Sequence, residues 1–186
     1  MDYNMELVKE NNDILKLECA KFDFNNPPFD AIEFAQELIR FMYDNNAIGL
    51  SANQVGIPYR IFAMRGSPEN FVCYNPKIVM PSEQEIMLEE SSLTYPGLLV
   101  KVKRPQHIKV RFQTPNGDTR TETFTGLTAR IFQHSLDNLD GIAYYNKANK
   151  YHRDLAFKKL KPVKMSESQI SNQLKKIQDI GKFQGI

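Results

Sequence analysis

Three absences narrow the possibilities for this chain. It has only two cysteines, Cys19 and Cys73, so it carries no disulfide framework, and such sparse cysteine is typical of the reducing cytoplasm. It has no long apolar run, so we expect neither a transmembrane helix nor a signal peptide. Neither sign of charge dominates. With 24 basic and 22 acidic residues the net charge is +2, and we therefore expect no DNA or membrane partner.

The length and composition are those of one folded domain. A chain of 186 residues, 41% hydrophobic and 25% charged, is long enough to bury a sizeable core. No internal repeat or low-complexity linker divides it. We therefore expect a single domain over residues 1–165 and a C-terminal helical extension over residues 166–186. Within that extension an apolar stripe predicts a helix over 166–182, formed by Ile170, Leu174, Ile177 and Ile180.

The first quarter of the chain predicts an irregular start followed by a helix. Residues 1–28 show no regular pattern. Asp30 followed by Glu33 has the form of a capping box, which starts a helix that should end near Asn45. Apolar residues recur at helical spacing in between, and we expect their face in the core: Ile32, Ala35, Leu38, Ile39 and Met42.

The middle of the chain is expected to form short strands. After a tight loop over residues 49–56, turn-forming residues separate candidate strands at 60–64, 71–74, 77–80 and 86–90. Residues 108–112 alternate between apolar and polar side chains, the pattern of a half-buried strand. Residues 115–118, Pro-Asn-Gly-Asp, predict a hairpin turn because Asn-Gly tolerates positive φ, and the returning strand would cover 119–124.

A second helix is expected to start after Gly126 and to end near Gly141. Its spacing puts four residues on one face, at i, i+4, i+7 and i+11: Leu127, Ile131, His134 and Asn138. The pattern favours Leu127 and Ile131 as core residues, although the same face could form the wall of a methionine-sized apolar pocket.

The same helix carries the most informative motif. Residues 133–141 read Gln-His-Ser-Leu-Asp-Asn-Leu-Asp-Gly. The frame is that of the metallohydrolase motif H-E-x-x-H, but Ser135 stands at the place of the general-base glutamate and Asn138 at the place of the second histidine. A zinc-like or ferrous ion needs several basic ligands, and hydrolysis needs a carboxylate. The motif therefore marks an active site whose working groups are replaced.

Two further segments agree with this motif. They are residues 49–56, Gly-Leu-Ser-Ala-Asn-Gln-Val-Gly, and residues 90–94, Glu-Ser-Ser-Leu-Thr. Over residues 5–160 the order and spacing of the three segments resemble the signature motifs of the peptide deformylases, which remove the formyl group from the initiator methionine of nascent chains. The resemblance, to a compact member of the family, implies an α+β fold in which antiparallel sheets surround a central motif helix.

The resemblance also implies a role for each matching position. Gln54 would hydrogen-bond the formyl oxygen, the Leu93 backbone N–H would stabilise the oxyanion, and Ser135 holds the place of the catalytic glutamate. The metal ligands of the family fall on Ser92, in place of cysteine, His134 and Asn138. The pocket would be lined by Ile48, Gly49, Glu90, Leu127 and Ile131.

The replacements favour a protein that has lost metal binding and deformylation. A serine hydroxyl is a poor substitute for thiolate, and an asparagine amide for imidazole. Loss of the general base alone typically lowers a rate by ~10²–10⁴-fold. We therefore expect no cofactor, and a retained pocket that binds a formyl-methionyl peptide or another partner. In such a protein His134 would be a satisfied core histidine, and Asp137 would cap or pair locally.

Two other functions stay open. A working deformylase would hold one divalent ion, iron, nickel or zinc, on Ser92, His134 and Asn138. A metal-free hydrolase would instead use Ser92 and His134 as nucleophile and base. Separately, a basic stretch from Lys147 to Lys164 is either a solvated face or, because the family acts on chains that leave the ribosome, a contact with ribosomal RNA.

Overall fold

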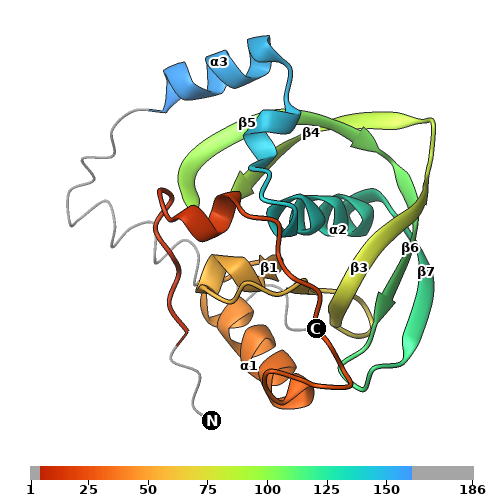
Figure 1. Cartoon of the computed structure of the whole chain (residues 1–186). Coiled ribbons are helices and arrows are strands. Elements are labelled where there is room, and N and C mark those ends of the chain that lie inside the picture. The colour runs from red at the N-terminus through yellow and green to blue at the C-terminus, as the bar shows by residue number, and fades with distance from the viewer. Residues whose placement is uncertain (1–4, 161–186) are drawn as a thin grey trace.

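The computed structural model describes residues 5–160. Its helices are α1 (Ala31–Asp44), α2 (Gly126–Leu139) and α3 (Lys150–Lys159) (Figure 1). Its strands are β1 (Gly49–Ser51), β2 (Ile61–Met64), β3 (Phe71–Pro81), β4 (Glu85–Ser92), β5 (Tyr95–Pro105), β6 (His107–Gln113) and β7 (Thr119–Thr125). Short 3-10 helices cover Asp13–Lys16, Ala52–Val55 and Tyr144–Lys147.

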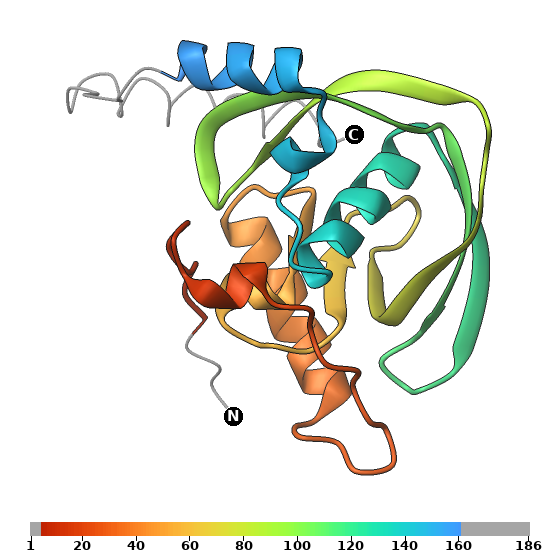
Figure 2. The ribbon, with the colours of Figure 1, turned by 45° about the horizontal axis from the view of Figure 1, so that its top comes forward.

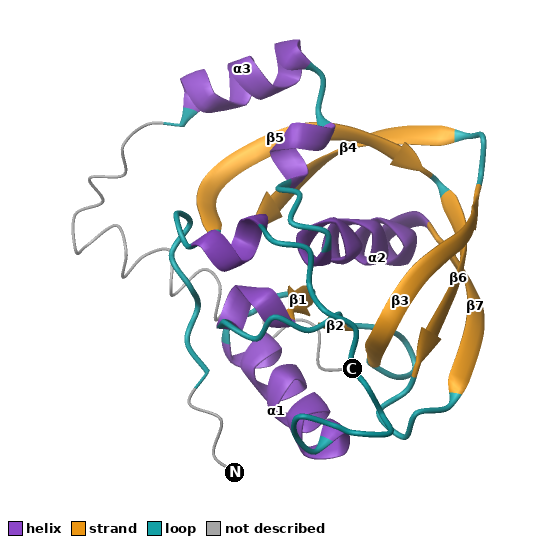
Figure 3. Ribbon diagram, viewed as in Figure 1, coloured by secondary structure: helices purple, strands orange, loops and turns teal. Residues whose placement is uncertain are grey.

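Two antiparallel sheets surround α2. Strands β1, β2, β3, β6 and β7 follow one another in this order in a five-stranded sheet, and β4 and β5 form a two-stranded sheet. α2 lies between the two sheets and contacts strands of both (Figure 3). The short strands β1 and β2 lie between α1 and α2 and contact both helices (Figure 2). The expected α+β fold with antiparallel sheets around the motif helix is confirmed.

α1 begins where the sequence predicts. The Asp30 side chain caps it by accepting a hydrogen bond from the backbone N–H of Glu33 at 2.8 Å. Its buried face contains Phe34, Leu38 and Met42, as expected of an amphipathic helix. Ile32 was expected on that face but is 49% exposed, because the helix turns Phe34 toward the core instead.

One predicted break between strands is wrong. Residues 71–74 and 77–80 belong to the single strand β3. Its pairing with β6 is irregular between Tyr74 and Lys77, and Asn75 there has φ of 49°. Asparagine tolerates this left-handed conformation, so the bulge absorbs the Asn-Pro pair without ending the strand.

The sequence predicts one of the two strands of the β4–β5 hairpin. Residues 86–90 are confirmed as part of β4, whereas β5 was not predicted. Strand β5 does alternate, with Leu98, Val100 and Val102 buried between exposed residues. The next inward position is occupied by Arg104, which is buried although it is charged. A charged residue at an inward position interrupts the alternation of apolar and polar residues from which a strand is predicted.

The elements that lead into the motif helix are confirmed. β6 and β7 cover the predicted strands at 108–112 and 119–124, and Gly117 in their turn has φ of 87°. α2 ends at Leu139, and Gly141 follows with φ of 71°. A Cβ at Gly141 would lie 2.6 Å from the backbone carbonyl carbon of Lys16, so this close approach of two segments requires glycine.

The remaining predictions concern the ends of the chain. Residues 5–28 contain one short 3-10 helix and are otherwise irregular, as expected. The helix predicted over 166–182 and the domain boundary after 165 lie outside the described residues. Among the helices of residues 5–160, none has the length and apolar character needed to cross a membrane.

Candidate functional site

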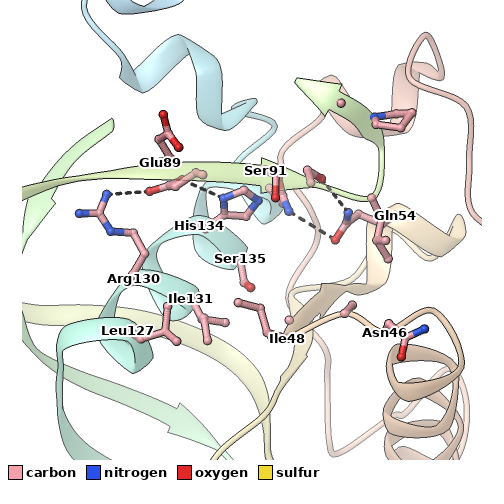
Figure 4. A pocket seen from close by; sticks show the side chains of 18 residues that line it. Asn46, Ile48, Gln54, Glu89, Ser91, Leu127, Arg130, Ile131, His134 and Ser135 are labelled. Atoms are coloured by element: carbon pink, nitrogen blue, oxygen red, sulfur yellow. Dashed lines mark hydrogen bonds and ion pairs between the residues drawn. The ribbon is translucent and has the colours of Figure 1, made fainter. Parts of the chain in front are cut away.

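A cavity of about 520 Å³ opens between α2, β1 and the end of β4 (Figure 4). All eleven residues that we predicted for the site line it, although they come from three separate stretches of the chain. They are Ile48, Gly49, Gln54, Glu90, Ser92, Leu93, Leu127, Ile131, His134, Ser135 and Asn138. The structure thus brings these residues together, while the role of each stays a prediction.

Gln54 is held in place by its own turn. Its Oε1 accepts a hydrogen bond from the Ser51 backbone N–H at 2.9 Å. Its Nε2 donates to Thr94 Oγ1 at 3.0 Å and lies 3.4 Å from Ser92 Oγ. One amide hydrogen is therefore firmly bonded and the other only weakly, so a carbonyl oxygen in the cavity could take the second without breaking the turn.

Gly49 allows β1 to lie directly against α2. A Cβ at this position would lie 2.7 Å from Ile131 Cγ2 and 3.3 Å from Ser135 Oγ. A hydrogen bond also joins β1 to α2, because Ser51 Oγ donates to the backbone carbonyl of Ser135 at 3.2 Å. The glycine therefore sets the width of the cavity at this point.

Glu90 is the centre of a buried group of charges behind the cavity. Its carboxylate accepts hydrogen bonds from Arg104 Nε at 2.6 Å and Nη2 at 2.9 Å, and from Arg130 Nη1 at 2.8 Å. Its Oε2 lies 2.9 Å from His134 Nδ1. Burial by itself would raise the pKa of Glu90, but the hydrogen bonds from His134 and Arg104 together hold that pKa well below its usual range. Glu90 is therefore a carboxylate at neutral pH.

The same charges join α2 to the β4–β5 hairpin. Arg130 on α2 donates to the backbone carbonyls of Val102 at 2.8 Å and Ile86 at 2.6 Å. Asp137, also on α2, accepts a hydrogen bond from Arg104 Nη1 at 2.6 Å. The expectation that Asp137 caps or pairs locally is wrong, because its shortest hydrogen bond is with Arg104, which lies 33 residues away on β5.

Two neighbours fix the ring of His134. Because an ionised carboxylate only accepts hydrogen bonds, the Nδ1 that faces Glu90 carries the hydrogen. Tyr144 stacks on the ring with centroids 5.1 Å apart, and its own hydroxyl donates to the Leu98 carbonyl at 2.6 Å. Nε2 has no hydrogen-bond partner among residues 5–160. We expected both ring nitrogens of His134 to have hydrogen-bond partners. In the described residues only Nδ1 has one.

The other two ligand positions bond to Gln54 and its neighbours. Asn138 Nδ2 lies 3.4 Å from Gln54 Oε1 and 3.5 Å from Ser51 Oγ. Ser92 Oγ accepts a hydrogen bond from the Thr94 backbone N–H at 3.3 Å. Within the described part of the chain, Ser92 Oγ makes no hydrogen bond with His134. Ser135, which holds the place of the glutamate, is buried at the foot of the cavity.

This set of donors does not suit a transition metal. His134 offers the single imidazole, Ser92 a neutral hydroxyl and Asn138 an amide, whereas zinc-type sites are built from thiolates, imidazoles and carboxylates. Among residues 5–160 there is no group of three or more His, Cys, Asp or Glu side chains that could hold one ion. The residues present do not fit the metal that the sequence resemblance implies.

The mouth of the cavity is apolar and open. Leu127 is 60% exposed and Ile48 49% exposed, while Ile131 lies buried behind them. The preferred interpretation of Leu127 as a core residue is therefore wrong, and it belongs to the cavity wall. Two large apolar side chains at the rim of a cavity are typical of a site that takes an apolar side chain of a ligand.

Comparison with known proteins agrees with this geometry. A family model of polypeptide deformylases matches residues 4–154. The chain belongs to the peptide deformylase family. It is 34% identical over 165 residues to the peptide deformylase of Thermodesulfovibrio yellowstonii, which covers 86% of this chain and 98% of that protein. It is 33% identical over 145 residues to the peptide deformylase of Wolbachia pipientis wMel, covering 71% of this chain and 81% of that protein.

Solved deformylases share the fold. A peptide deformylase from Synechococcus elongatus in complex with actinonin superposes with a TM-score of 0.76 at 25% identity, covering 84% of this chain and 85% of that one. A Met-Ala-Ser-bound class I type b deformylase from Acinetobacter baumannii gives 0.72 at 29% identity, covering 79% and 99%. The chain therefore has the peptide deformylase fold.

The sequence does not reveal the residues that support the cavity from behind. Arg104 and Tyr144 are both buried, and each reaches the site through a partner far away in the sequence. Arg104 could have been found, because it continues the inward positions of Leu98, Val100 and Val102 on β5. Tyr144 lies in a short 3-10 helix, and no local pattern points from there to His134.

The basic stretch proposed for ribosomal RNA is only partly described. Lys147 Nζ lies 3.5 Å from Asp137 Oδ1, so it belongs to the charges behind the cavity. Other basic residues of the stretch lie on α3, namely Lys150, Arg153, Lys158 and Lys159. Lys161 and Lys164 lie outside the described residues.

Proposed function

We propose that this member of the family neither holds a catalytic ion nor removes formyl groups, and that its cavity binds N-formylmethionyl peptides. The observation that carries the proposal is a contrast within one cavity. Ser92, Ser135 and Asn138 stand where the family needs a thiolate, a carboxylate and an imidazole, whereas Gln54 and the apolar wall are in place.

The proposed loss of catalysis follows from the chemistry of the three replacements. A serine hydroxyl keeps its proton near neutral pH, so Ser92 supplies no anionic ligand. Asn138 supplies no basic nitrogen, and Ser135 cannot accept a proton from an attacking water. Loss of the general base alone typically lowers a rate by ~10²–10⁴-fold, and here it coincides with loss of two ligands.

The proposed binding follows from what the cavity still offers. The second hydrogen of Gln54 Nε2 and the backbone N–H of Leu93 are donors, which suit the formyl oxygen. The methionine side chain would contact Leu127 and Ile131. Donors of this kind disfavour a free ammonium group, so a formylated peptide should bind more tightly than the same peptide with a free amino terminus.

A titration of the full chain with formyl-Met-Ala-Ser and with Met-Ala-Ser tests this proposal, with formate measured in the same samples. We expect binding that is tighter for the formylated peptide and no release of formate, whether or not iron, nickel or zinc is supplied. Metal-dependent formate release would establish the working deformylase instead. Absence of binding by either peptide would show that the cavity has lost its peptide ligand.

A metal-free hydrolase is the second candidate, because Glu90 orients His134 as the third member of a catalytic triad does. In that reaction Ser92 Oγ would attack the carbonyl carbon while His134 Nε2 takes its proton. The Ser92 hydroxyl is bonded instead to the Thr94 N–H, which is why we rank this candidate second. Labelling by a fluorophosphonate probe that disappears in Ser92→Ala would support it, and an unlabelled folded protein would end it.

Three further expectations extend the proposal beyond the cavity. A cytoplasmic location is consistent with Cys19 and Cys73, which are free and buried. A divalent iron, nickel or zinc ion is expected only if the protein proves active. A contact of the stretch from Lys147 to Lys164 with ribosomal RNA predicts salt-sensitive co-sedimentation with ribosomes, and no binding at low salt would contradict it.

A further inference from the structure

The outer face of β6 and β7 is basic and rich in hydroxyl groups. On β6 the side chains of Ile108, Val110 and Phe112 are buried, which turns Lys109 and Arg111 to the outside. On β7 the outward positions opposite them are exposed threonines, Thr119, Thr121, Thr123 and Thr125. Figure 1 shows these two strands at the edge of the molecule, on the far side of β3 from α1.

A second cavity, of about 610 Å³, continues this face toward the N-terminal segment. Its basic lining residues are Lys21, Arg60, Lys77 and Arg111, and its single acidic one is Glu18. The bulge in β3 puts Lys77 directly opposite Arg111 in the antiparallel ladder. Like charges at directly opposite positions of two strands destabilise a sheet unless something neutralises them.

Within residues 5–160, Arg60 is the only one of these cavity cations with an acidic partner. Arg60 is paired, with Nη1 2.7 Å from Asp140 Oδ1 and 3.8 Å from Glu18 Oε1. Lys21, Lys77, Lys109 and Arg111 have no acidic partner in the described part of the chain. The whole protein carries a net charge of only +2, so this is a local concentration of positive charge on an almost neutral protein.

We propose that this face, defined by Lys21, Lys77, Lys109, Arg111 and the β7 threonines, binds the sugar-phosphate backbone of RNA. Phosphates complement the unpaired cations, and outward residues on one strand follow one another at a spacing of ~7 Å, which suits a chain of regularly placed charges. The proposal does not rest on the peptide cavity, which lies between other elements.

The threonines favour RNA over DNA. A threonine hydroxyl both donates and accepts, which matches the 2′-hydroxyl that RNA has and DNA lacks. The outward positions of β6 and β7 carry no Phe, Tyr or Trp, and their one imidazole, His107, is only partly exposed, so the face has no platform for stacking successive bases. Binding should therefore be independent of sequence and strongly dependent on salt.

Fluorescence anisotropy of a labelled oligouridylate with the full-length protein tests the proposal. With three phosphates engaged, log K should fall against log salt concentration with a slope of about −2 between about 50 and 200 mM salt. The variant Lys77→Gln/Lys109→Gln/Arg111→Gln should bind at least ~10-fold more weakly at low salt and lose most of that slope. Its thermal midpoint should be unchanged or higher, because the repulsion between Lys77 and Arg111 is gone.

A matched variant removes the same charge elsewhere, at exposed residues of the N-terminal segment and β5: Lys9→Gln/Lys101→Gln/Lys103→Gln. It should keep RNA affinity within about twofold of the wild type at equal salt. Equal loss in both triple variants would overturn the proposal, as would full competition by polyglutamate or by inorganic phosphate at low concentration. Thr121→Val should narrow the preference for oligouridylate over oligothymidylate. If the triple variant does not fold, the single variant Lys77→Gln tests the proposal, and we expect it to lose less RNA affinity than the triple variant would.

Discussion

Glu90 Oε2 lies 2.9 Å from His134 Nδ1, behind a cavity in which the other working groups of the family are replaced. The contact holds the imidazole in one orientation. The same carboxylate also bonds Arg104 and Arg130, which join the β4–β5 hairpin to α2. Glu90 thus orients His134, the one ligand type that this site shares with the family, and also holds α2 against the β4–β5 hairpin. The second contact gives Glu90 a structural role even without catalysis.

Replacing this carboxylate should destabilise the whole fold. Glu90→Gln would leave two buried guanidinium groups short of their counter-charge, and breaking such a buried pair typically costs about 3–5 kcal/mol. Urea unfolding at neutral pH measures the change. The neighbour Glu89→Gln is the matched control, because Glu89 is exposed and its loss should change the unfolding free energy by less than ~0.5 kcal/mol.

The same contact predicts how stability depends on acid. The pKa of Glu90 is held below its ordinary value of 4.5 in the folded protein, so the unfolded chain binds a proton first as the pH falls. The contribution of Glu90 is therefore complete above about pH 4.5 and is lost progressively below it. In Glu90→Gln the unfolding free energy should fall less steeply over that range. Parallel curves for the two proteins would contradict this account.

A methyl group at Gly49 should distort the peptide cavity. In Gly49→Ala the new Cβ would lie 2.7 Å from Ile131 Cγ2, so β1 and α2 would move apart at a cost of ~1–3 kcal/mol. We expect weaker binding of formyl-Met-Ala-Ser in titration calorimetry together with lower stability.

Gly126→Ala separates this steric effect from backbone strain. A Cβ at Gly126 meets no atom within 4 Å, but its φ of 56° strains any other residue. It should lose some stability and keep peptide affinity. Equal affinity in Gly49→Ala and the wild type would show that the peptide does not reach this part of the cavity.

The apolar rim should contribute to peptide affinity and not to folding. Leu127 and Leu99 are 60% and 57% exposed, but only Leu127 lines the cavity. Leu127→Ser should weaken binding of formyl-Met-Ala-Ser by ~1 kcal/mol, about fivefold in Kd, whereas Leu99→Ser should leave it unchanged. Thermal midpoints of the two variants should be similar. An equal loss of affinity in both would place the methionine side chain elsewhere.

The two cysteines should be chemically inert in the folded protein. Burial raises the pKa of Cys19 to about 11 and that of Cys73 well above its usual range, and the thiolate is the reactive form. With Ellman's reagent at mildly alkaline pH, we expect no rapid reaction of the native protein and reaction of both thiols in denaturant. A fast native reaction would mean that the core around Cys19 opens readily.

Local signals explain which elements the sequence could predict. The Asp30 cap, the Asn-Gly turn and the spacing of the motif helix each depend on residues within a few positions, and each was predicted correctly. Every site residue predicted from the three family segments, and from positions close to them in the sequence, lines one cavity. Their spacing carries long-range information that composition and periodicity do not.

Long-range pairing explains what the sequence could not predict. Glu90 meets Arg104 across 14 residues and His134 across 44, and no local rule distinguishes such a buried charge from a solvated one. The bulge at Asn75 looked like a strand end for the same reason, because the ladder with β6 keeps the strand continuous there. The orientation of Ile32 likewise depended on which face of α1 the sheet covers.

Metal content tests the central claim most directly. The protein and its variant Ser92→Cys/Ser135→Glu/Asn138→His are purified anaerobically with iron, nickel or zinc supplied, and bound metal per chain is measured after gel filtration. We predict stoichiometric metal in the variant, whose donors match the family, and far less than stoichiometric metal in the wild type. Stoichiometric metal in the wild type, lost on His134→Ala, would contradict the account.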